Sequence, residues 1–405
     1  MTTTAMSEVE QLCQRVASAT SKCLPHGSLT KRPLALAHAA NSIDMRFHTG
    51  VVTYDPSEFL ITAKAGTPLR DLVSALAEYS QYLPFDPLFV AGGSTLGGCV
   101  AAGISGPNRL LYGGLRDFVM EVEMIDGLGN LVRGGGKVVK NAAGFDLPKL
   151  VVGSYGRLGI LTEVTIKVFP QPASSASMWI GGDDNRMTII DCLTVATALQ
   201  AQPLPIAAIE FASVPDNQPV YAMLVRFAGP VGSMPRVLER ARQIVQAAAA
   251  RITRPLLAID GDKNPPSELQ RSLPTPSQSL WRDPEVDLPE ENCLVRIATN
   301  PNQASALAEA LAHWNTRLRF SNAAAVAWLE VPAARLQDLD LLLQALGLSA
   351  VVIADGGAKT IMKFAEDAPT IFLGNRTWCP TAERIQRAID PSGRFASYSS
   401  SAVQK

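Results

Sequence analysis

Two apolar patterns divide the first 170 residues of this chain into helices and strands. Apolar residues at helical spacing predict a helix over 7–22 and a second helix that begins with Thr67 as its N-cap and Pro68 in its first turn. The apolar face of the second helix is expected to consist of Leu69, Leu72, Val73 and Leu76. Apolar and β-branched runs predict strands over 50–54, 59–65, 118–125 and 162–168.

From about residue 174 the glycines become sparse, and helical and strand patterns alternate. Helices are predicted over 187–200, 236–252, 303–316, 333–346 and 381–389, and strands over 208–212, 221–227, 294–298, 324–329 and 349–354. Seven prolines and many serines predict a long exposed loop over 255–289. The mixture of elements indicates an α+β fold, and 405 residues favour two domains.

Glycine is concentrated in the second part of the first 170 residues. The stretch 91–170 holds 17 of the 30 glycines, with four clusters at 91–107, 112–119, 140–147 and 152–163. Glycine lets a backbone approach a ligand closely, and successive N–H groups in such turns form nests that bind anions. We therefore favour a cradle for a phosphate-containing cofactor over the alternative, a β-rich domain with tight turns. The loop 26–31 adds hydroxyls and a lysine that could hold phosphate, although an ordinary surface turn fits it better.

Two common phosphate-binding motifs do not fit. Val138 follows the glycine run and Lys137, where a P-loop requires serine or threonine. The first strand-to-helix unit also lacks the GxGxxG of a Rossmann fold.

Charge and composition exclude several classes of protein. The 36 basic and 37 acidic residues nearly cancel, so there is no global attraction to nucleic acid or to an anionic membrane. Neither a signal peptide nor an apolar run long enough to span a bilayer is recognisable, so a cytoplasmic protein is expected, with membrane contact only through partners. The six cysteines and four histidines show no CxxC, HxH or HExxH spacing, so no metal site and no iron–sulfur cluster is expected.

Five motifs in a fixed order resemble the FAD-binding domain of the vanillyl-alcohol oxidase/p-cresol methylhydroxylase (PCMH) superfamily. They are L-P-x-D-P (83–87), S-T-L-G-G (94–98), Y-G-G-x-R-D (112–117), K-N-x-A-G-F-D-L (140–147) and G-S-x-G-x-L-G-I-x-T-E (153–163). Within that superfamily the chain is more similar to the FAD-binding E subunits of bacterial glycolate oxidases. The resemblance implies a PCMH-type two-subdomain FAD-binding domain over 1–172, an α+β cap-like domain over 173–375, and a C-terminal tail over 376–405.

The resemblance also implies that FAD is the cofactor, and it assigns the contacts motif by motif. Loop 27–31 would be the first pyrophosphate-binding loop, although it has only one glycine where the family usually has two or three. For Asn141 and Gly144 a structural turn is an equal alternative. The residues expected to bind FAD are Gly27, Ser28, Thr30, Lys31, Pro87, Ser94, Thr95, Gly97, Gly98, Gly103, Gly106, Gly113, Asn141, Gly144, Gly156, Gly159 and Ile160.

The function implied is that of the FAD-binding subunit of a glycolate oxidase complex, which converts glycolate to glyoxylate. Its partners would be a sister flavoprotein subunit and an iron–sulfur subunit. The alternatives are a self-sufficient FAD-dependent dehydrogenase of D-lactate or another 2-hydroxy acid, and a scaffold subunit that has lost FAD.

Oxidation of a 2-hydroxy acid requires a base, a cation for the carboxylate and a hydride path to the flavin. The sequence identifies no catalytic base. Arg226 and Arg296, on predicted strands, are available for the carboxylate, with a solvated surface position as the favoured alternative.

Overall fold

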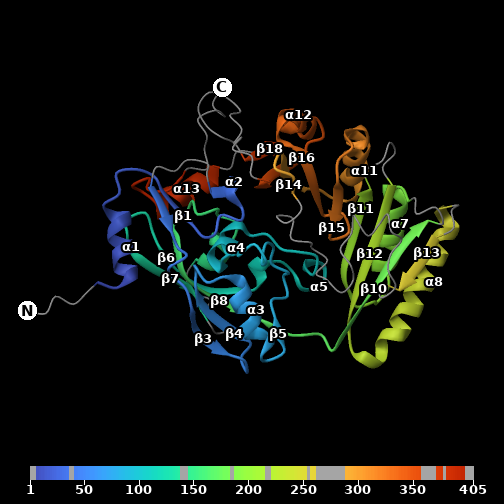
Figure 1. The fold of residues 1–405 in the computed structure, drawn as a ribbon, viewed down its shortest axis with the longest axis horizontal. Helices are drawn as coiled ribbons and strands as arrows, with labels where there is room; N and C mark the ends of the chain where they lie inside the picture. The colour runs from blue at the N-terminus through green and yellow to red at the C-terminus, as the bar shows by residue number, and fades with distance from the viewer. Residues whose placement is uncertain are drawn as a thin grey trace, which may run out of the picture.

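The structure is a computed structural model of the chain, and it describes residues 6–35, 41–136, 145–182, 187–214, 220–252, 256–260, 288–356, 371–376 and 380–396. Two large antiparallel sheets lie next to each other, one in each half of the molecule (Figure 1). Helices and strands occur in both halves, which confirms the α+β class. Among the described helices, none combines the length and apolar composition needed to cross a bilayer.

The first half is organised around a five-stranded sheet in the order β3-β4-β8-β6-β7. Its strands are β3 (Val51–Asp55), β4 (Leu60–Lys64), β6 (Val119–Ile125), β7 (Leu131–Gly135) and β8 (Ile160–Lys167). The sheet forms a core with the helices α3 (Leu69–Ala77) and α4 (Leu96–Ala102). Leu72 and Leu76 of α3 and Val100 of α4 are fully buried there. Shorter elements complete this half: β5 (Gln81–Tyr82), α5 (Arg109–Tyr112), η1 (Leu115–Asp117), α6 (Leu147–Val151) and β9 (Phe169–Pro170).

Both ends of the described chain pack on this first half. Near the start, β1 (Cys23–His26) pairs in parallel with β2 (Asn41–Asp44), flanked by α1 (Glu8–Ala17) and α2 (Arg32–Ala35). Near the end, α13 (Pro380–Ile389, red) lies beside these elements (blue) in Figure 1. Phe395 forms a bridge with Cys23, and Gln386 Nε2 donates to the Arg157 carbonyl at 3.0 Å. We propose that residues 380–396 belong to the first domain rather than to a separate tail.

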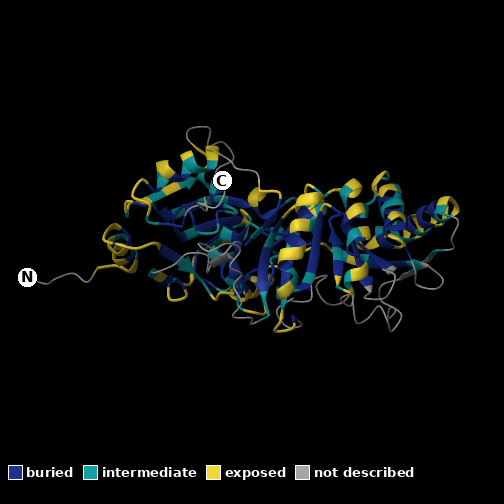
Figure 2. Cartoon of the chain, turned by 90° about the horizontal axis from the view of Figure 1, so that it is seen from above, coloured by how far each residue is buried: buried dark blue, intermediate teal, exposed yellow. Residues whose placement is uncertain are grey.

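The second half contains a nine-stranded sheet in the order β13-β10-β12-β11-β15-β16-β14-β17-β18. The strands are β10 (Ser174–Gly182), β11 (Ile206–Val214), β12 (Val220–Gly229), β13 (Leu256–Asp260), β14 (Asn292–Ala298), β15 (Leu318–Ser321), β16 (Val326–Pro332), β17 (Ser349–Asp355) and β18 (Phe372–Gly374). Figure 2 shows helices with exposed outer surfaces along one side of the buried strands. These helices are α7 (Ile189–Gln200), α8 (Met234–Ile252), α11 (Pro301–Ala310) and α12 (Leu336–Ala345).

The face of this sheet opposite the helices, here called the inner face, packs against the first half of the molecule, here called the first domain. Successive side chains of a strand point to opposite faces. In β14, Val295 and Ile297 belong to the core under the helices, whereas Leu294 packs in a separate cluster with Phe89 and Ile104 of the first domain. The two domains therefore share an apolar boundary.

Several local predictions were wrong. Thr67 is not the N-cap of α3: that position is Pro68, and the Thr67 hydroxyl donates instead to the Lys64 carbonyl at 2.7 Å. Val73 is 42% exposed, because it lies at the edge of the apolar face of α3. The start of the expected loop 255–289 forms β13, which pairs with β10, whereas 261–287 lie outside the described residues. The elements β1, β2, β10, β15, β18, α4, α5 and α6 were not predicted.

Candidate functional site

A pocket in the first domain lies where three segments meet: β1 with the loop after it, the start of α4, and the turn before β8. It holds about 780 Å³ of empty space, counted out to its open mouth. Ten of the residues predicted to bind FAD line it, and they are Gly27, Ser28, Thr30, Lys31, Ser94, Thr95, Gly97, Gly98, Gly156 and Gly159. Residues more than 120 positions apart in the sequence thus share one pocket.

The loop after β1 lies directly against the start of α4. A Cβ atom at Gly27 would overlap with the Thr95 hydroxyl oxygen and come within 2.8 Å of Thr95 Cγ2, so only glycine fits there. The Ser28 hydroxyl donates to the Gly93 carbonyl at 2.7 Å and fixes the loop to the segment before α4. Leu29 has a φ of 57°, in the left-handed region that usually favours glycine. Leu29 thus adopts the conformation that a further glycine would supply.

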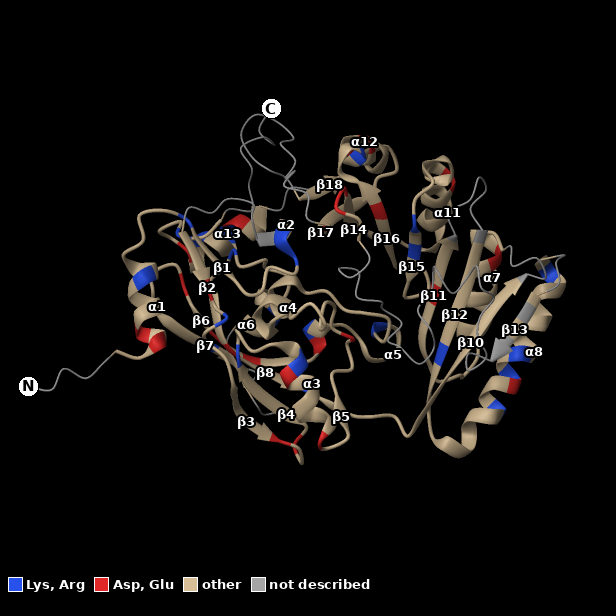
Figure 3. Cartoon of the chain, viewed as in Figure 1, with Lys and Arg blue, Asp and Glu red and all other residues tan. Residues whose placement is uncertain are grey.

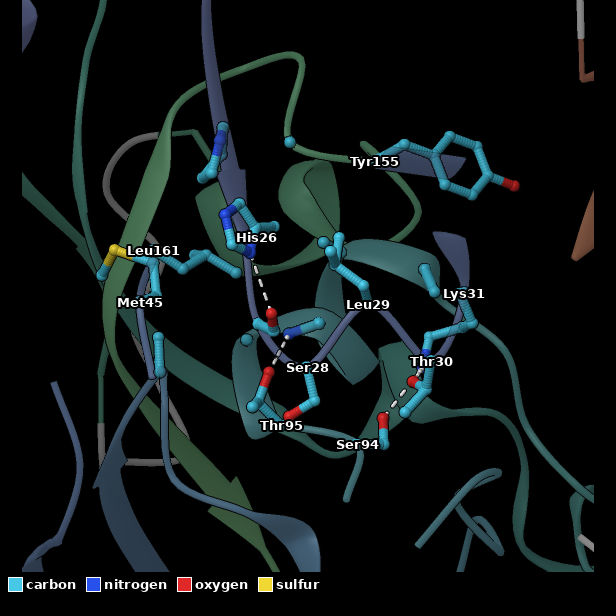
Figure 4. A pocket seen from close by; sticks show the side chains of 18 of the residues that line it. His26, Ser28, Leu29, Thr30, Lys31, Met45, Ser94, Thr95, Tyr155 and Leu161 are labelled. Atoms are coloured by element: carbon cyan, nitrogen blue, oxygen red, sulfur yellow. Dashed lines mark hydrogen bonds between the residues drawn. The ribbon is translucent and has the colours of Figure 1, made fainter. Parts of the chain in front are cut away.

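A buried cation and two hydroxyls gather at one side of the pocket. Lys31 Nζ donates to Ser94 Oγ at 2.8 Å and to Thr30 Oγ1 at 3.1 Å (Figure 4). The same ammonium lies 5.2 Å from the centre of the Phe89 ring. Lys31 is 9% exposed, and no aspartate or glutamate is among the residues that line the pocket. Hydroxyl groups beside a cation suit an anionic ligand such as phosphate.

The other walls of the pocket are mainly apolar. Met45 and Leu161 lie together at one side, and Tyr155 lies at the opposite side with its ring pointing outward (Figure 4). Gly159, in the turn before β8, has a φ of 154°, and a Cβ atom there would come within 2.5 Å of the Ile125 carbonyl oxygen. The backbone at position 159 can therefore follow its path behind the pocket only if the residue there is glycine. Apolar walls of this kind accommodate the ring systems of a cofactor.

The remaining predicted residues do not line the pocket, or fall outside the described chain. Gly103 ends α4 in the left-handed conformation, and Gly113 ends α5. The Gly106 N–H donates to the Phe85 carbonyl at 2.8 Å. Pro87 and the fully buried Ile160 also lie away from the pocket lining, whereas Asn141 and Gly144 lie outside the described residues. Contact of these seven residues with FAD stays a prediction, as does that of the ten residues that line the pocket.

His26 is the one histidine that lines this pocket, and both of its ring nitrogens are engaged. Nδ1 lies 2.9 Å from the Gly27 carbonyl oxygen, which can only accept, so Nδ1 carries the proton. Nε2 then accepts from the Ser42 hydroxyl at 2.7 Å. This arrangement orients the loop and leaves His26 poorly placed to act as a base.

Sequence reasoning assigned no role in the site to several residues that line the pocket. Met45, Ala65 and Leu161 lie at or just beyond strand ends, and Tyr155 directly precedes the predicted residue Gly156. The position of Tyr155 between Ser154 and Gly156 was a usable signal, because the motif around it was already recognised. No comparable signal marks Met45 or Ala65, which reach the pocket only through the pairing of distant strands.

Arg226 is not a solvated surface residue, contrary to the favoured interpretation. It lies on β12, 18% exposed, with Nη1 3.3 Å from Asn108 Oδ1 and 4.0 Å from Asp86 Oδ2 in the first domain. Asp86 in turn accepts hydrogen bonds from the Asn108 backbone and side-chain amides at 2.9 and 3.1 Å. Burial raises the pKa of Asp86 to about 6. Arg226 therefore joins the two domains and does not face the pocket.

Comparison with known proteins supports a cofactor-binding role for the domain that holds the pocket. Residues 3–135 match the family described as FAD binding domain. Glycolate oxidase subunit GlcE of Escherichia coli (strain K12) is 38% identical over 226 residues, which is 56% of this chain and 61% of the relative. Glycolate oxidase subunit GlcD of Bacillus subtilis (strain 168) is 34% identical over 128 residues, or 32% of this chain and 27% of the relative. A D-lactate dehydrogenase of Anaerostipes hadrus is 32% identical over 161 residues, or 40% and 33%.

A solved structure of alkyldihydroxyacetonephosphate synthase shares the fold over nearly the whole chain. The TM-score is 0.63, with 96% of this chain and 73% of that chain covered, at 15% sequence identity. The aligned part of this chain spans only 61% or less of the length of the three curated relatives. Residues 3–135 thus match the family of FAD binding domains, and the chain is similar to glycolate oxidase subunit GlcE.

Proposed function

We propose that this chain is the FAD-binding subunit of a glycolate oxidase or dehydrogenase complex. One observation carries the proposal: a pocket formed by glycine- and hydroxyl-rich loops, with Lys31 inside it, lies at a domain that matches the FAD-binding family. The similarity to GlcE supports the choice of glycolate as the substrate of the complex.

The residues of the pocket fit FAD in two respects. The hydroxyls of Ser28, Thr30, Ser94 and Thr95, together with the Lys31 ammonium, would hold the pyrophosphate. The walls at Met45, Leu161 and Tyr155 would exclude water from the ring systems. Bound FAD supplies the hydride acceptor for oxidation of an alcohol. The chain itself binds and orients the cofactor, and we assign no catalytic base to it.

We also propose that the partners are a sister flavoprotein subunit and an iron–sulfur subunit, and that any contact with a membrane goes through that complex. In this division of labour the sister subunit oxidises glycolate and the iron–sulfur subunit accepts the electrons. Support comes from the similarity to GlcE and GlcD, which are both named as subunits of glycolate oxidase.

A second candidate is a self-sufficient dehydrogenase of D-lactate or another 2-hydroxy acid, which the similarity to D-lactate dehydrogenases supports. The third possibility, a scaffold without FAD, is less favoured. Leu29 has a left-handed backbone where a further glycine would be expected, which supports a retained pyrophosphate loop.

The test is a visible absorption spectrum of the purified chain, followed by heat release and chromatography of the flavin. We expect FAD close to one per chain. A colourless protein that takes up no added FAD, yet binds its sister subunits, would instead establish the scaffold. If the isolated chain oxidises glycolate with a dye acceptor at a rate typical of enzymes, the division of labour among subunits is wrong.

A further inference from the structure

Two neighbouring strands at one end of the nine-stranded sheet contact two of the segments that form the pocket. These strands, β17 and β18, pair with each other, and Val351 lies opposite Phe372. Together they are called the β17–β18 edge here. They belong to the second half of the molecule, here called the second domain, whereas the pocket lies in the first domain.

The first contact is an ion pair next to the proposed pyrophosphate loop. Arg32 directly follows the pocket residue Lys31, and its Nε donates to Asp355 Oδ1 at 3.1 Å. Arg32 Nη2 lies 2.9 Å from the same oxygen, and the Asp355 side chain is only 7% exposed. The helix α2, which carries Arg32, lies beside β17 (Figure 3). The end of the loop 27–31 is therefore fixed to the second domain.

The second contact is a stack of side chains at the turn before β8. Tyr155 lines the pocket, and the centre of its ring lies 6.0 Å from that of Phe372. The Arg157 guanidinium lies 5.7 Å from the centre of the Tyr155 ring and 5.6 Å from that of Phe372. Arg157 is 4% exposed, so water weakens these cation–π contacts little. The turn that carries Gly156 and Gly159 is therefore fixed to the same edge.

The pocket and the domain boundary also share one apolar cluster. Ala102 lines the pocket and packs in the cluster that contains Ile353 of β17 and Ile371, which directly precedes β18. Phe89, whose ring centre lies 5.2 Å from the Lys31 ammonium, belongs to the same cluster. Because a close-packed interior transmits strain, a shift of the β17–β18 edge would also move the walls of the pocket.

We propose that the β17–β18 edge couples FAD binding in the first domain to docking of the second domain, with Asp355 and Phe372 as positioning residues. The inference rests on the proposed function, because it concerns the pocket assigned to FAD. Loops that are held in shape before the cofactor arrives lose less conformational entropy on binding. Neither residue lines the pocket, so an effect on FAD affinity must pass through the segments that they hold. The matched region 3–135 would then bind FAD weakly without the second domain.

The first test is titration of the flavin-free chain with FAD, followed by fluorescence. Phe372→Leu keeps the apolar bulk without the ring, and Asp355→Asn removes the charge that pairs with Arg32. Each variant is expected to weaken FAD binding by about 3- to 30-fold. Asp355→Glu, which keeps the charge, is expected to recover part of the loss.

Matched controls remove the same kinds of contact elsewhere in the second domain. Trp314→Leu removes a ring that lies 3.7 Å from the Arg335 guanidinium, and Glu330→Gln removes the partner of Arg317 at 3.6 Å. None of these four residues lines the pocket. Both controls are expected to bind FAD with the wild-type affinity.

A second measurement detects the coupling from the side of the second domain. All five tryptophans lie between residues 179 and 378, so tryptophan emission during denaturant unfolding follows that domain. Because coupling is reciprocal, FAD is expected to raise the denaturant midpoint in wild type, and to raise it less in Phe372→Leu. A merely structural loss would lower the midpoint of Phe372→Leu by the same amount with and without FAD.

Wild-type FAD affinity in either Phe372→Leu or Asp355→Asn would overturn the inference and leave the proposed function intact. The same holds if FAD does not shift the tryptophan-reported midpoint of the wild type. Should Phe372→Leu fail to fold, both measurements are made on Asp355→Asn. A wild type that takes up no FAD would overturn the proposed function and the inference together, and its visible spectrum shows this before any variant is compared.

Discussion

The pocket of the first domain and the inner face of the second both hold cations in poorly hydrated surroundings, but they neutralise them differently. In the pocket, hydroxyl groups surround Lys31, and none of the lining residues is acidic. On the sheet, Glu210 accompanies Arg319, and Asp86 of the first domain accompanies Arg226. The carboxylates beside Arg319 and Arg226 belong to the fold itself, whereas the hydroxyls that line the pocket can also donate to an anionic ligand. The polar groups around the cations thus differ between the structural ion pairs of the second domain and the proposed ligand pocket of the first.

The largest expected effect on stability comes from removing the buried carboxylate that pairs with an arginine of the sheet. Glu210 is fully buried and accepts from Arg319 Nε at 2.8 Å, the Ser321 hydroxyl at 2.6 Å and the Asn322 N–H at 3.3 Å. Glu210→Ala leaves these donors without their acceptor, and we expect the free energy of unfolding to fall by about 3–5 kcal/mol. Denaturant unfolding of the second domain measures the change.

The control for that experiment is an exposed glutamate. Glu239 on α8 is 60% exposed and pairs with Arg242 at 3.4 Å. Glu239→Ala is expected to change stability by no more than about 0.5 kcal/mol. Similar losses in the two variants would contradict a structural role for the buried pair.

Asp86 provides a test by pH. Burial raises its pKa to about 6, from a usual value near 4, so the folded chain binds an extra proton between these values. The free energy of unfolding is therefore expected to fall as pH rises from about 4 to about 6, by at most about 3 kcal/mol. Asp86→Asn should remove this part of the pH dependence. Parallel stability curves for wild type and variant would show that Asp86 titrates normally in the folded chain.

The next prediction concerns the pyrophosphate loop. In Gly27→Ala the new methyl group overlaps with the Thr95 hydroxyl, so the loop must move away from α4. We expect FAD to bind at least about tenfold more weakly, or about 1.4 kcal/mol. Gly232→Ala is the matched control, since nothing lies within 4 Å of its added methyl group. FAD titration by fluorescence would count against the loop assignment if both variants bound equally well.

The smallest effect is expected at Leu29. Its left-handed backbone carries strain that glycine does not have, so Leu29→Gly should stabilise the chain by about 0.5–1 kcal/mol. Thermal unfolding measures the shift. A destabilised variant would mean that packing of the 38% exposed Leu29 side chain outweighs the backbone strain.

The sequence alone was sufficient to identify the pocket residues that belong to contiguous motifs. Ser94 to Gly98 and Gly156 to Gly159 were found because each turn imposes its residue types locally. The sequence could not show why position 27 must be glycine, because the residue that a side chain there would meet, Thr95, lies 68 positions away. The same limit applies to Arg226 and Arg296: their sequence neighbourhoods are alike, and only strand register and domain contact show that one is paired and the other is not.

The most direct test of the account is to titrate the flavin-free chain with FAD and with riboflavin, which lacks the phosphates. If Lys31 and the surrounding hydroxyls bind the pyrophosphate, FAD should bind at least about a hundredfold more tightly than riboflavin, since charge-assisted contacts contribute about 1.5–3 kcal/mol each. Equal affinities, or no binding of either compound, would contradict the assignment of this pocket to FAD.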